Sequence, residues 1–497
     1  MSERTTTTAT QRWTLALAAV GSFMVVLDLL VVATALTAIQ RDLHASLESL
    51  EWTVNAYTVS FAVLLLTTSA IGDRIGRRRV FIAGLALFAL ASAGCAVAPD
   101  VGWLIGLRAV QGVGAAAVMP MALTLLNAAF PPERRGWATG IYGSVTAIGV
   151  LLGPALGGAI TQGIAWPWIF WLNVPIALLA IPLVFRHVKE STAPARPDPV
   201  GLALGGLAVL GVIWALVRAT AAGWGSAEVV TGLGGGVVLG IAFVAWERRT
   251  IAPMLPMRLF ASRAFSAGST AVFFLNATAT GAIFLTAQFL QAVQGNNPLE
   301  AGLQLLPWGV APVAIAPFAG ALADRFGERR LVVAGLFVEV IGIGWLAAIA
   351  TPSVGYPPLA GALTLSGVGF ALAMPAVTKA VVSLVAPADI AKASGTFSTM
   401  RQLGGAFGVA VAGAVFAATG TLANPAGFTK GFVAAMLAAA AIALAGALAA
   451  LGLHRHRATV SASPAPRAAA GFPAPDGKSD REPAAARRTA PPRNSAE

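Results

Sequence analysis

An aspartate and an arginine, Asp28 and Arg108, stand within two long apolar segments of this sequence. Asp28 follows Arg12 by 16 residues, or about 24 Å of helix, and Arg108 follows Asp100 by eight residues, or about 12 Å. If these segments cross a lipid bilayer in opposite directions, both side chains lie at a similar depth. An ionised carboxylate is costly in hydrocarbon, so Asp28 can take up a proton. We predict an Asp28–Arg108 proton relay, with a structural pair that joins two helices as the alternative.

Glu339 and Arg401 are two further charges within apolar segments, both in the second half of the chain. Glu339 stands near the middle of its segment, where it has a role either in proton coupling or in packing. Arg401 stands about 13 Å into its segment by the rise per residue of a helix. It is a candidate to contact Glu339 or an anionic group of a bound molecule.

Aromatic and amide side chains supply a candidate binding site for a planar or cationic molecule. Trp308 lies deep in its segment, directly after Pro307. Together with other aromatic residues it is a candidate to line a cavity, with ordinary core packing as the alternative. The predicted substrate-binding set is Tyr57, Gln111, Phe273, Phe274, Phe284, Trp308 and Arg401.

The segments that carry these residues are predicted to be transmembrane helices of an all-α polytopic membrane protein. Of the 497 residues, 57% are hydrophobic and 11% are charged, whereas soluble proteins carry about 25% charged residues. A spanning helix needs roughly 20 apolar residues. Cutting the sequence at its charged and Pro/Gly breaks yields fourteen segments: approximately 13–38, 50–71, 80–98, 103–129, 137–162, 168–185, 200–219, 229–246, 265–293, 299–322, 331–351, 358–386, 393–419 and 431–453. Twelve is the alternative count, because 200–219 and 229–246 are glycine-rich and close to charges.

The net charge of +12 is explained by membrane topology better than by nucleic-acid binding. Arginines and lysines gather in alternate loops, such as 74–79, 134–135 and 325–330. The positive-inside rule places these loops and both termini in the cytoplasm, around an inner (cytoplasmic) membrane. The single cysteine, Cys95, excludes an intrachain disulfide and a cysteine-cluster metal site. The four histidines stand in loops or in the tail, so no metal site is expected.

One short polar signature occurs twice, at Asp73–Arg79 and at Asp324–Arg330. Each copy closes an apolar segment and opens the next, which indicates a duplicated membrane protein, a common design of secondary transporters. The predicted organisation follows from aligning the copies. It comprises a cytoplasmic N-terminus (1–12), a six-helix bundle (13–187), a linker with two additional helices (188–264), a second six-helix bundle (265–453) and a disordered cytoplasmic tail (454–497).

Several stretches of the sequence resemble the major facilitator superfamily. The repeated signatures resemble its motif A, Arg108–Gly114 resembles motif B, and Gly149–Gly158 resembles motif C, the antiporter motif. Trp166–Pro175 is similar to the sixth helix of the fourteen-helix branch of drug:proton antiporters. The resemblance spans roughly residues 13–453, and it departs from the pattern at Ser69, where motif A normally begins with glycine.

The resemblance implies two sets of residues that act in conformational change. Asp73 is expected to meet the positive N-terminal end of segment 393–419 and latch the two bundles, whereas a basic loop that only sets topology is the alternative. The motif C glycines allow close helix contact and Pro154 permits a kink; in the family this helix seals one side of the central path. The latch set is Asp73, Arg74, Gly76, Arg77, Asp324, Arg325 and Gly327. The antiporter set is Gly149, Gly153, Pro154, Gly157 and Gly158.

The resemblance implies a proton-driven exporter of small amphipathic or antibiotic-like compounds in a bacterial cell membrane. Export of an endogenous metabolite is the alternative, and motif C disfavours import. Gly477–Ser479 resembles the end of a phosphate-binding loop, but Phe472 replaces its earlier glycine, so ATP is not expected to drive the protein. A membrane enzyme would need paired carboxylates or a histidine cluster, and a sensor would need a folded output module after residue 453. No cofactor is expected.

Overall fold

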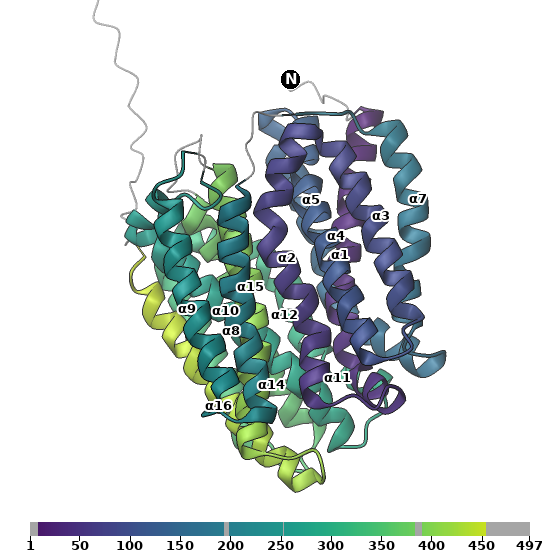
Figure 1. Ribbon diagram of the computed structural model, residues 1–497, viewed down its shortest axis with the longest axis vertical. Coiled ribbons are helices and arrows are strands. Elements are labelled where there is room, and N and C mark those ends of the chain that lie inside the picture. Colours follow the sequence, from purple (N-terminus) through teal and green to yellow (C-terminus); the bar gives the residue numbers. More distant parts are fainter. Residues whose placement is uncertain (1–7, 193–197, 252, 383–389, 454–497) are drawn as a thin grey trace, which may run out of the picture. The chain divides into compact units, whose positions relative to one another are not determined.

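The computed structural model describes residues 8–192, 198–251, 253–382 and 390–453 (Figure 1). Helices dominate these ranges, because a helix satisfies its backbone polar groups internally and can therefore lie in lipid. The elements are α1 (Ala9–Asp42), α2 (Leu47–Ile75), α3 (Arg77–Ala96), α4 (Val101–Ala129), α5 (Pro132–Gly163), α6 (Trp168–Trp171), α7 (Asn173–His187), α8 (Pro199–Ala222), α9 (Ala227–Glu247), the 3₁₀ helix η1 (Met257–Ala261), α10 (Arg263–Ala292), α11 (Pro298–Gln304), α12 (Leu306–Phe326), α13 (Glu328–Ile349), α14 (Tyr356–Val382), α15 (Ile390–Thr419) and α16 (Pro425–Ala450).

Each of the fourteen predicted segments contains a helix, so the predicted all-α polytopic fold is confirmed. In the described part of the chain, thirteen helices are long and apolar enough to cross a membrane by length and composition. The remaining predicted segment, 299–322, contains α12, which has 21 residues. Two predicted helices are each divided, at Leu172 and at Leu305. Pro175 and Pro307 stand in the first turn after these breaks, where proline favours the start of a new helix.

Side-chain caps fix the starts of the two helices that matter most below. Ser46 accepts a hydrogen bond from the backbone N–H of Ser49 at the start of α2, and Asp100 accepts one from Trp103 at the start of α4. Such caps satisfy backbone donors that the helix itself leaves free. They hold α2 and α4 at fixed depths beside each other, where the two helices are in contact.

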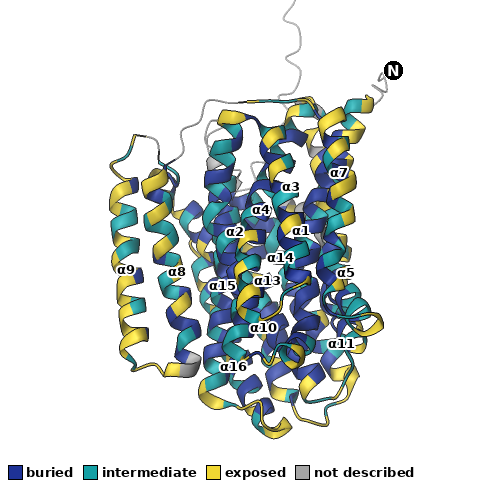
Figure 2. Cartoon of the chain, turned by 45° about the vertical axis from the view of Figure 1, so that its right-hand side comes forward, coloured by how far each residue is buried: buried dark blue, intermediate teal, exposed yellow. Residues whose placement is uncertain are grey.

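The two halves of the chain meet along a few helix pairs. Within the first half α2 and α3 contact α4, and α1 contacts α5; within the second half α10 contacts α15 and α16, and α13 contacts α14. The halves meet where α2 contacts α15, α5 contacts α11 and α12, and α1 contacts α10. Of the two additional helices, α8 contacts both α2 and α15, whereas α9 packs on α8 and has many exposed residues (Figure 2). The predicted bundle boundaries stay predictions, and the predicted tail 454–497 lies outside the described residues.

We call the end of the helices at which α1 begins the proximal end, and the end at which α1 ends the distal end. Because successive long helices alternate in direction, α2 and α4 begin at the distal end, whereas α5 and α15 begin at the proximal end. One buried apolar cluster at the distal end includes Leu36 and Ile39 of α1 together with Phe289 of α10 and Phe416 of α15. The halves therefore share an apolar core at this end.

Candidate functional site

Asp28 of α1 belongs to a cluster of five buried polar side chains. The Nη1 atom of Arg108, on α4, lies 2.5 Å from Asp28 Oδ2. Gln111 Nε2, on α4, and Asn173 Nδ2, on α7, each donate to Asp28 Oδ1 at 2.8 Å. Ser92, on α3, accepts from Gln111 at 2.6 Å and from Asn173 at 3.2 Å. All five side chains are buried, so four helices of the first half meet at one polar centre, the Asp28 cluster.

Arg108 has further partners on α2. Its Nε donates to the carbonyl oxygen of Thr53 at 3.1 Å, and its guanidinium carbon lies 4.2 Å from the centre of the Tyr57 ring. Its Nη1 also donates to Gln111 Oε1 at 2.7 Å. Tyr57 and Gln111, which the sequence analysis assigned to substrate binding, thus lie at this charged centre. The reason is helical periodicity, because Tyr57 stands one turn after Thr53 and Gln111 stands one turn after Arg108.

The Asp28 cluster can convert a proton into a change of helix contacts. Ionised Asp28 accepts hydrogen bonds from three side chains on two helices, α4 and α7, and these bonds depend on its charge. A proton on its carboxyl would cancel that charge and leave Arg108 as an uncompensated buried cation, which is costly. The Nη2 atom of Arg108 already has no partner among the described residues. Protonation would therefore weaken the contacts that join α1 to α4 and α7.

Two members of the cluster, Ser92 and Asn173, were missed by sequence reasoning. Asn173 stands inside the quoted Trp166–Pro175 stretch, and a lone amide among apolar residues at the start of a membrane helix was the available signal. Ser92 gave no signal, because serine is common wherever membrane helices approach each other closely.

Glu339 and Arg401 do not share a hydrogen-bond network among the described residues. Glu339, on α13, is fully buried, and neither carboxylate oxygen has a hydrogen-bond partner among the described residues. Arg401, on α15, reaches into the first half, where its Nη2 lies 4.0 Å from the Sδ atom of Met119 on α4. The two side chains are therefore not hydrogen bonded to each other. The reason is position, because α13 packs on α14 and α16, whereas Arg401 lies against Met119 of the first half.

The motif C glycines bring α5 against α1. A Cβ atom on Gly153 would stand 2.6 Å from the Cβ of Leu30, and one on Gly149 would stand 3.2 Å from the ring of Phe23. Gly157 contacts the backbone of the same helix, so all three glycines form one face. No larger residue fits at Gly153 without moving the two helices apart.

The distal end of α5 also contacts the second half. Gly158 packs against the backbone of Pro298 on α11, and Gly302 of α11 packs against the carbonyl of Pro154. Toward the proximal end of α5, Gly143 has no neighbour within 4 Å of the place where a Cβ would stand. These contacts therefore join the halves at the distal end of α5.

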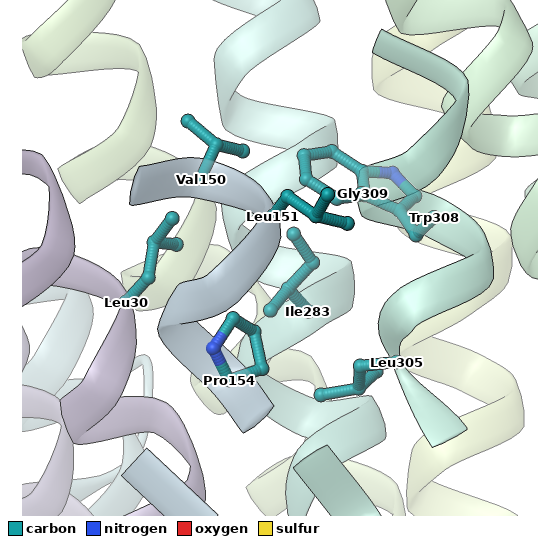
Figure 3. Close-up of a pocket in the computed structure, with 8 residues that line it drawn as sticks. All are labelled: Leu30, Val150, Leu151, Pro154, Ile283, Leu305, Trp308 and Gly309. Atoms are coloured by element: carbon teal, nitrogen blue, oxygen red, sulfur yellow. The ribbon is translucent and has the colours of Figure 1, made fainter. Parts of the chain in front are cut away.

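A small apolar cavity lies at this contact between the halves (Figure 3). Its volume is about 10 Å³, roughly the space of one water molecule. It is lined by Leu30, Val150, Leu151 and Pro154 of the first half and by Ile283, Leu305, Trp308 and Gly309 of the second. Trp308 thus takes part in the contact between the halves, in a space too small for an organic molecule.

The predicted aromatic residues are not gathered in one cavity. Phe273 packs on Phe407 of α15, with ring centres 5.3 Å apart, whereas Phe274 faces α16. Phe284 is buried in the distal core that contains Trp308. The rings of Phe273 and Phe274 touch, with centres 5.5 Å apart, but Phe273 also packs on α15 whereas Phe274 reaches α16.

The first copy of the basic signature joins α2 to α3 by a tight turn. Gly76 has a φ of +124°, a conformation that glycine adopts without strain. Asp73 Oδ1 accepts from Arg77 Nε at 2.7 Å. Glu190 accepts from the backbone N–H groups of residues 78–79 at 2.9 and 3.2 Å, and so caps the start of α3. Sequence reasoning missed Glu190, whose role depends on how the chain after α7 folds back.

The second copy repeats the turn but not its partners. Gly327 has a φ of +86° between α12 and α13, and the guanidinium of Arg325 lies 5.4 Å from the ring centre of Phe326. The side chain of Asp324 and the residues just before α15 lie outside the described part of the chain. The predicted contact of Asp73 with the start of α15 therefore stays a prediction, and Arg74 is exposed.

Known proteins resemble this chain over most of its length. The family model described as the Major Facilitator Superfamily matches residues 18–246 and 267–490. The tetracenomycin C resistance and export protein of Streptomyces glaucescens is 34% identical over 409 residues, which cover 81% of this chain and 76% of that protein. The puromycin resistance protein pur8 of Streptomyces alboniger is 35% identical over 406 residues, 80% of each chain. A solved bacterial homologue of the human lysosomal transporter Spinster has a TM-score of 0.64 at 16% identity, covering 90% of this chain and 98% of that one, a likeness of fold alone.

Proposed function

Since the chain belongs to the Major Facilitator Superfamily and is a multi-pass membrane transporter, we propose that it is a proton-coupled exporter of small amphipathic or antibiotic-like compounds. Its relatives are named for resistance to, or export of, tetracenomycin C and puromycin. Transport would proceed by alternating access, in which the two halves rock against each other around a central site.

The observation that carries the proton coupling is the Asp28 cluster. The exposed fractions of Asp28 and Arg108 are 1% and 0%, and the two side chains form a direct ion pair inside the first half. A proton that enters from one side would neutralise Asp28 and weaken its bonds to Arg108 and Asn173. One elementary charge moved across 100 mV is worth about 2.3 kcal/mol, enough to bias two conformations of similar free energy. Asp28 is therefore the proposed proton carrier, and Arg108 is its positioning partner.

We propose that the proximal end, with both termini, faces the cytoplasm, so that the distal end faces outward. The glycine contacts of α5 with α1 and α11 would then seal the outer end of the transport path, and the motif A turn would lie in the cytoplasm. In that arrangement Asp73 latches the halves on the cytoplasmic side. Because Arg401 reaches from α15 to Met119 of the first half, we propose that it contacts an anionic or acceptor group of the substrate.

The test is active efflux from energised membrane vesicles that contain the full chain. Puromycin and ethidium serve as probes, and export is measured with and without a protonophore. Asp28→Asn mimics a permanently protonated carboxyl, so it should bind the probe but lose protonophore-sensitive efflux. Asp100→Asn, which keeps an exposed helix cap, is the matched control and should transport normally. Wild-type efflux by Asp28→Asn would move the proton site elsewhere, and protonophore-insensitive efflux by the wild type would end the proton-coupled proposal.

A further inference from the structure

A second buried carboxyl stands in the first half, outside the Asp28 cluster. Glu51 lies near the distal start of α2 and has no exposed surface, and neither of its carboxylate oxygens has a hydrogen-bond partner among the described residues. Asn55, one turn further along α2, is equally buried, and both atoms of its amide also lack partners in the described part. Buried polar groups without partners are rare, and each calls for an explanation.

Glu51 lies at the contact between α2 of the first half and α15 of the second half, which we call the seam. Its carboxylate fills the space beside Gly413 of α15, where an added Cβ would stand 2.7 Å from Glu51 Oε2 and closer still to Oε1. An alanine at position 413 would therefore displace the Glu51 carboxylate from its place in the closed seam. The same seam continues toward the proximal end, where Thr399 Oγ1 donates to the carbonyl oxygen of Ala62 at 3.4 Å. Any movement that parts α2 from α15 at the distal end would uncover Glu51.

The charges nearest to Glu51 do not compensate it. Glu48, one turn closer to the distal end, has the same sign and already pairs with Arg218 of α8 at 3.3 Å. Arg218 in turn holds Glu228 at 2.8 Å. The guanidinium of Arg218 is thus shared between the carboxylates of Glu48 and Glu228, and neither bond involves Glu51.

The described residues of α4 and α15, which also pack on α2, bring no free counter-charge to Glu51. Arg108 of α4 is paired with Asp28 of α1. On α15 the nearest charged residue described along the helix is Arg401, twelve residues or about 18 Å from Gly413. A buried ionised carboxylate without a partner is strongly unfavourable, so the closed seam accommodates Glu51 only in its neutral, protonated form.

We propose that Glu51 is a second proton-carrying carboxyl, which holds its proton while α2 and α15 are closed at the distal end and exchanges it with the solution when they part. The inference rests on the proton-coupled export proposed above and adds a second site to it. Asp28 would bind a proton within one half, whereas proton binding by Glu51 would depend on whether the two halves are in contact at the distal end. The seam would then close only after Glu51 has bound a proton.

The test measures the opening of the distal end as a function of pH. Spin labels are attached to cysteines introduced at two exposed distal residues, Arg41 of α1 and Ala418 of α15, in the full chain with Cys95→Ala, and their separation is measured by pulsed electron resonance. Ionised Glu51 favours the open seam, so the ratio of open to closed molecules should rise with pH, by up to about tenfold per pH unit for one proton. In Glu51→Gln this rise should be lost, with the closed form favoured at every pH.

Three further variants make the outcome decisive. Glu48→Gln, which changes the neighbouring half-buried carboxyl, should keep the rise with pH. Gly413→Ala places a methyl group where the Glu51 carboxyl lies, and should favour the open form at every pH; Gly234→Ala, which has no neighbour within 4 Å, is its control and should change nothing. An unchanged pH dependence in Glu51→Gln overturns the inference. If Asp28→Asn alone then removes the dependence, proton coupling at Asp28 stands without Glu51.

Discussion

The two halves of this transporter share an architecture but treat their buried charges differently. In the first half, Asp28 accepts bonds from Arg108, Gln111 and Asn173, and these come from two neighbouring helices. In the second half, Glu339 is equally buried and has no hydrogen-bond partner among the described residues. The charge of Asp28 is compensated by a cation and two amide donors, whereas a carboxyl without partners is held neutral for as long as it stays buried. The arrangement of helices recurs in the second half, but the hydrogen-bonded cluster around a buried carboxylate does not recur at Glu339 in the part of the chain that the structure describes.

The two basic signatures show the same difference at the proximal end. In both copies a glycine with positive φ ends one helix and begins the next. In the first copy three arginines start α3, and Glu190 from a distant segment caps the helix. In the second copy Glu328 itself occupies the first turn of α13. An acid at a helix start is favourable in both cases, but only the first copy ties its helix to the chain that leads to α8.

The largest effect is expected for Arg108→Ala. The substitution leaves Asp28 buried without its cation, and breaking one side of a buried pair costs about 3–5 kcal/mol. Active efflux should be lost, and the thermal unfolding midpoint of the purified protein should fall. Because a proton on Asp28 relieves the unpaired charge, the fall should be larger at high pH than at low pH.

Two companion variants sharpen this result. Adding Asp28→Asn to Arg108→Ala should restore most of the stability but none of the efflux. Arg218→Ala, which removes a partly exposed cation with surface partners, should cost no more than about 1 kcal/mol. Equal losses for the Arg108 and Arg218 variants would contradict the special status of the first half's buried pair.

A smaller effect is expected for Asp73→Asn at the first motif A turn. The change removes the bond to Arg77 and any attraction to the start of α15, which together are worth about 0.3–2 kcal/mol. Insertion and folding should be normal, while efflux slows by about tenfold. The measurement is the initial rate of puromycin efflux at matched expression. Arg79→Gln, at a side chain that is 74% exposed, is the control. A wild-type efflux rate in Asp73→Asn would mean that the loop sets membrane topology and does not latch the halves.

The sequence predicted those features that depend on one helix at a time. Hydropathy located the fourteen segments, because the length of apolar chain that crosses a bilayer is nearly constant. The constant rise per residue of a helix placed Asp28 and Arg108 at a similar depth. The breaks at Leu172 and Leu305 were not predicted, because both lie within apolar runs where the only signal is a nearby proline.

Features that depend on the rotation of one helix against another were not predicted. Ser92 and Asn173 join the Asp28 cluster because α3 and α7 turn those faces toward α1. Glu51 meets Gly413 across 362 positions of sequence, and no periodicity within α2 indicates which neighbour it faces. The neighbours of the aromatic residues of α10 were not predicted for the same reason, since the depth of a residue in the membrane does not tell which helix its ring faces.

The smallest effect is expected for Glu339→Gln in the second half. Glu339 and Glu51 are both buried and unpartnered among the described residues, but α13 contacts α12, α14 and α16 of its own half, whereas Glu51 lies where the halves part. A carboxyl whose surroundings move as one body stays neutral throughout transport, and an amide of the same shape replaces it at little cost. Protonophore-sensitive efflux of puromycin should stay within about twofold of wild type, with an unchanged unfolding midpoint. If Glu339→Gln instead abolished efflux while Asp28→Asn retained it, the proton would be carried in the second half, and the contrast between the halves would be reversed.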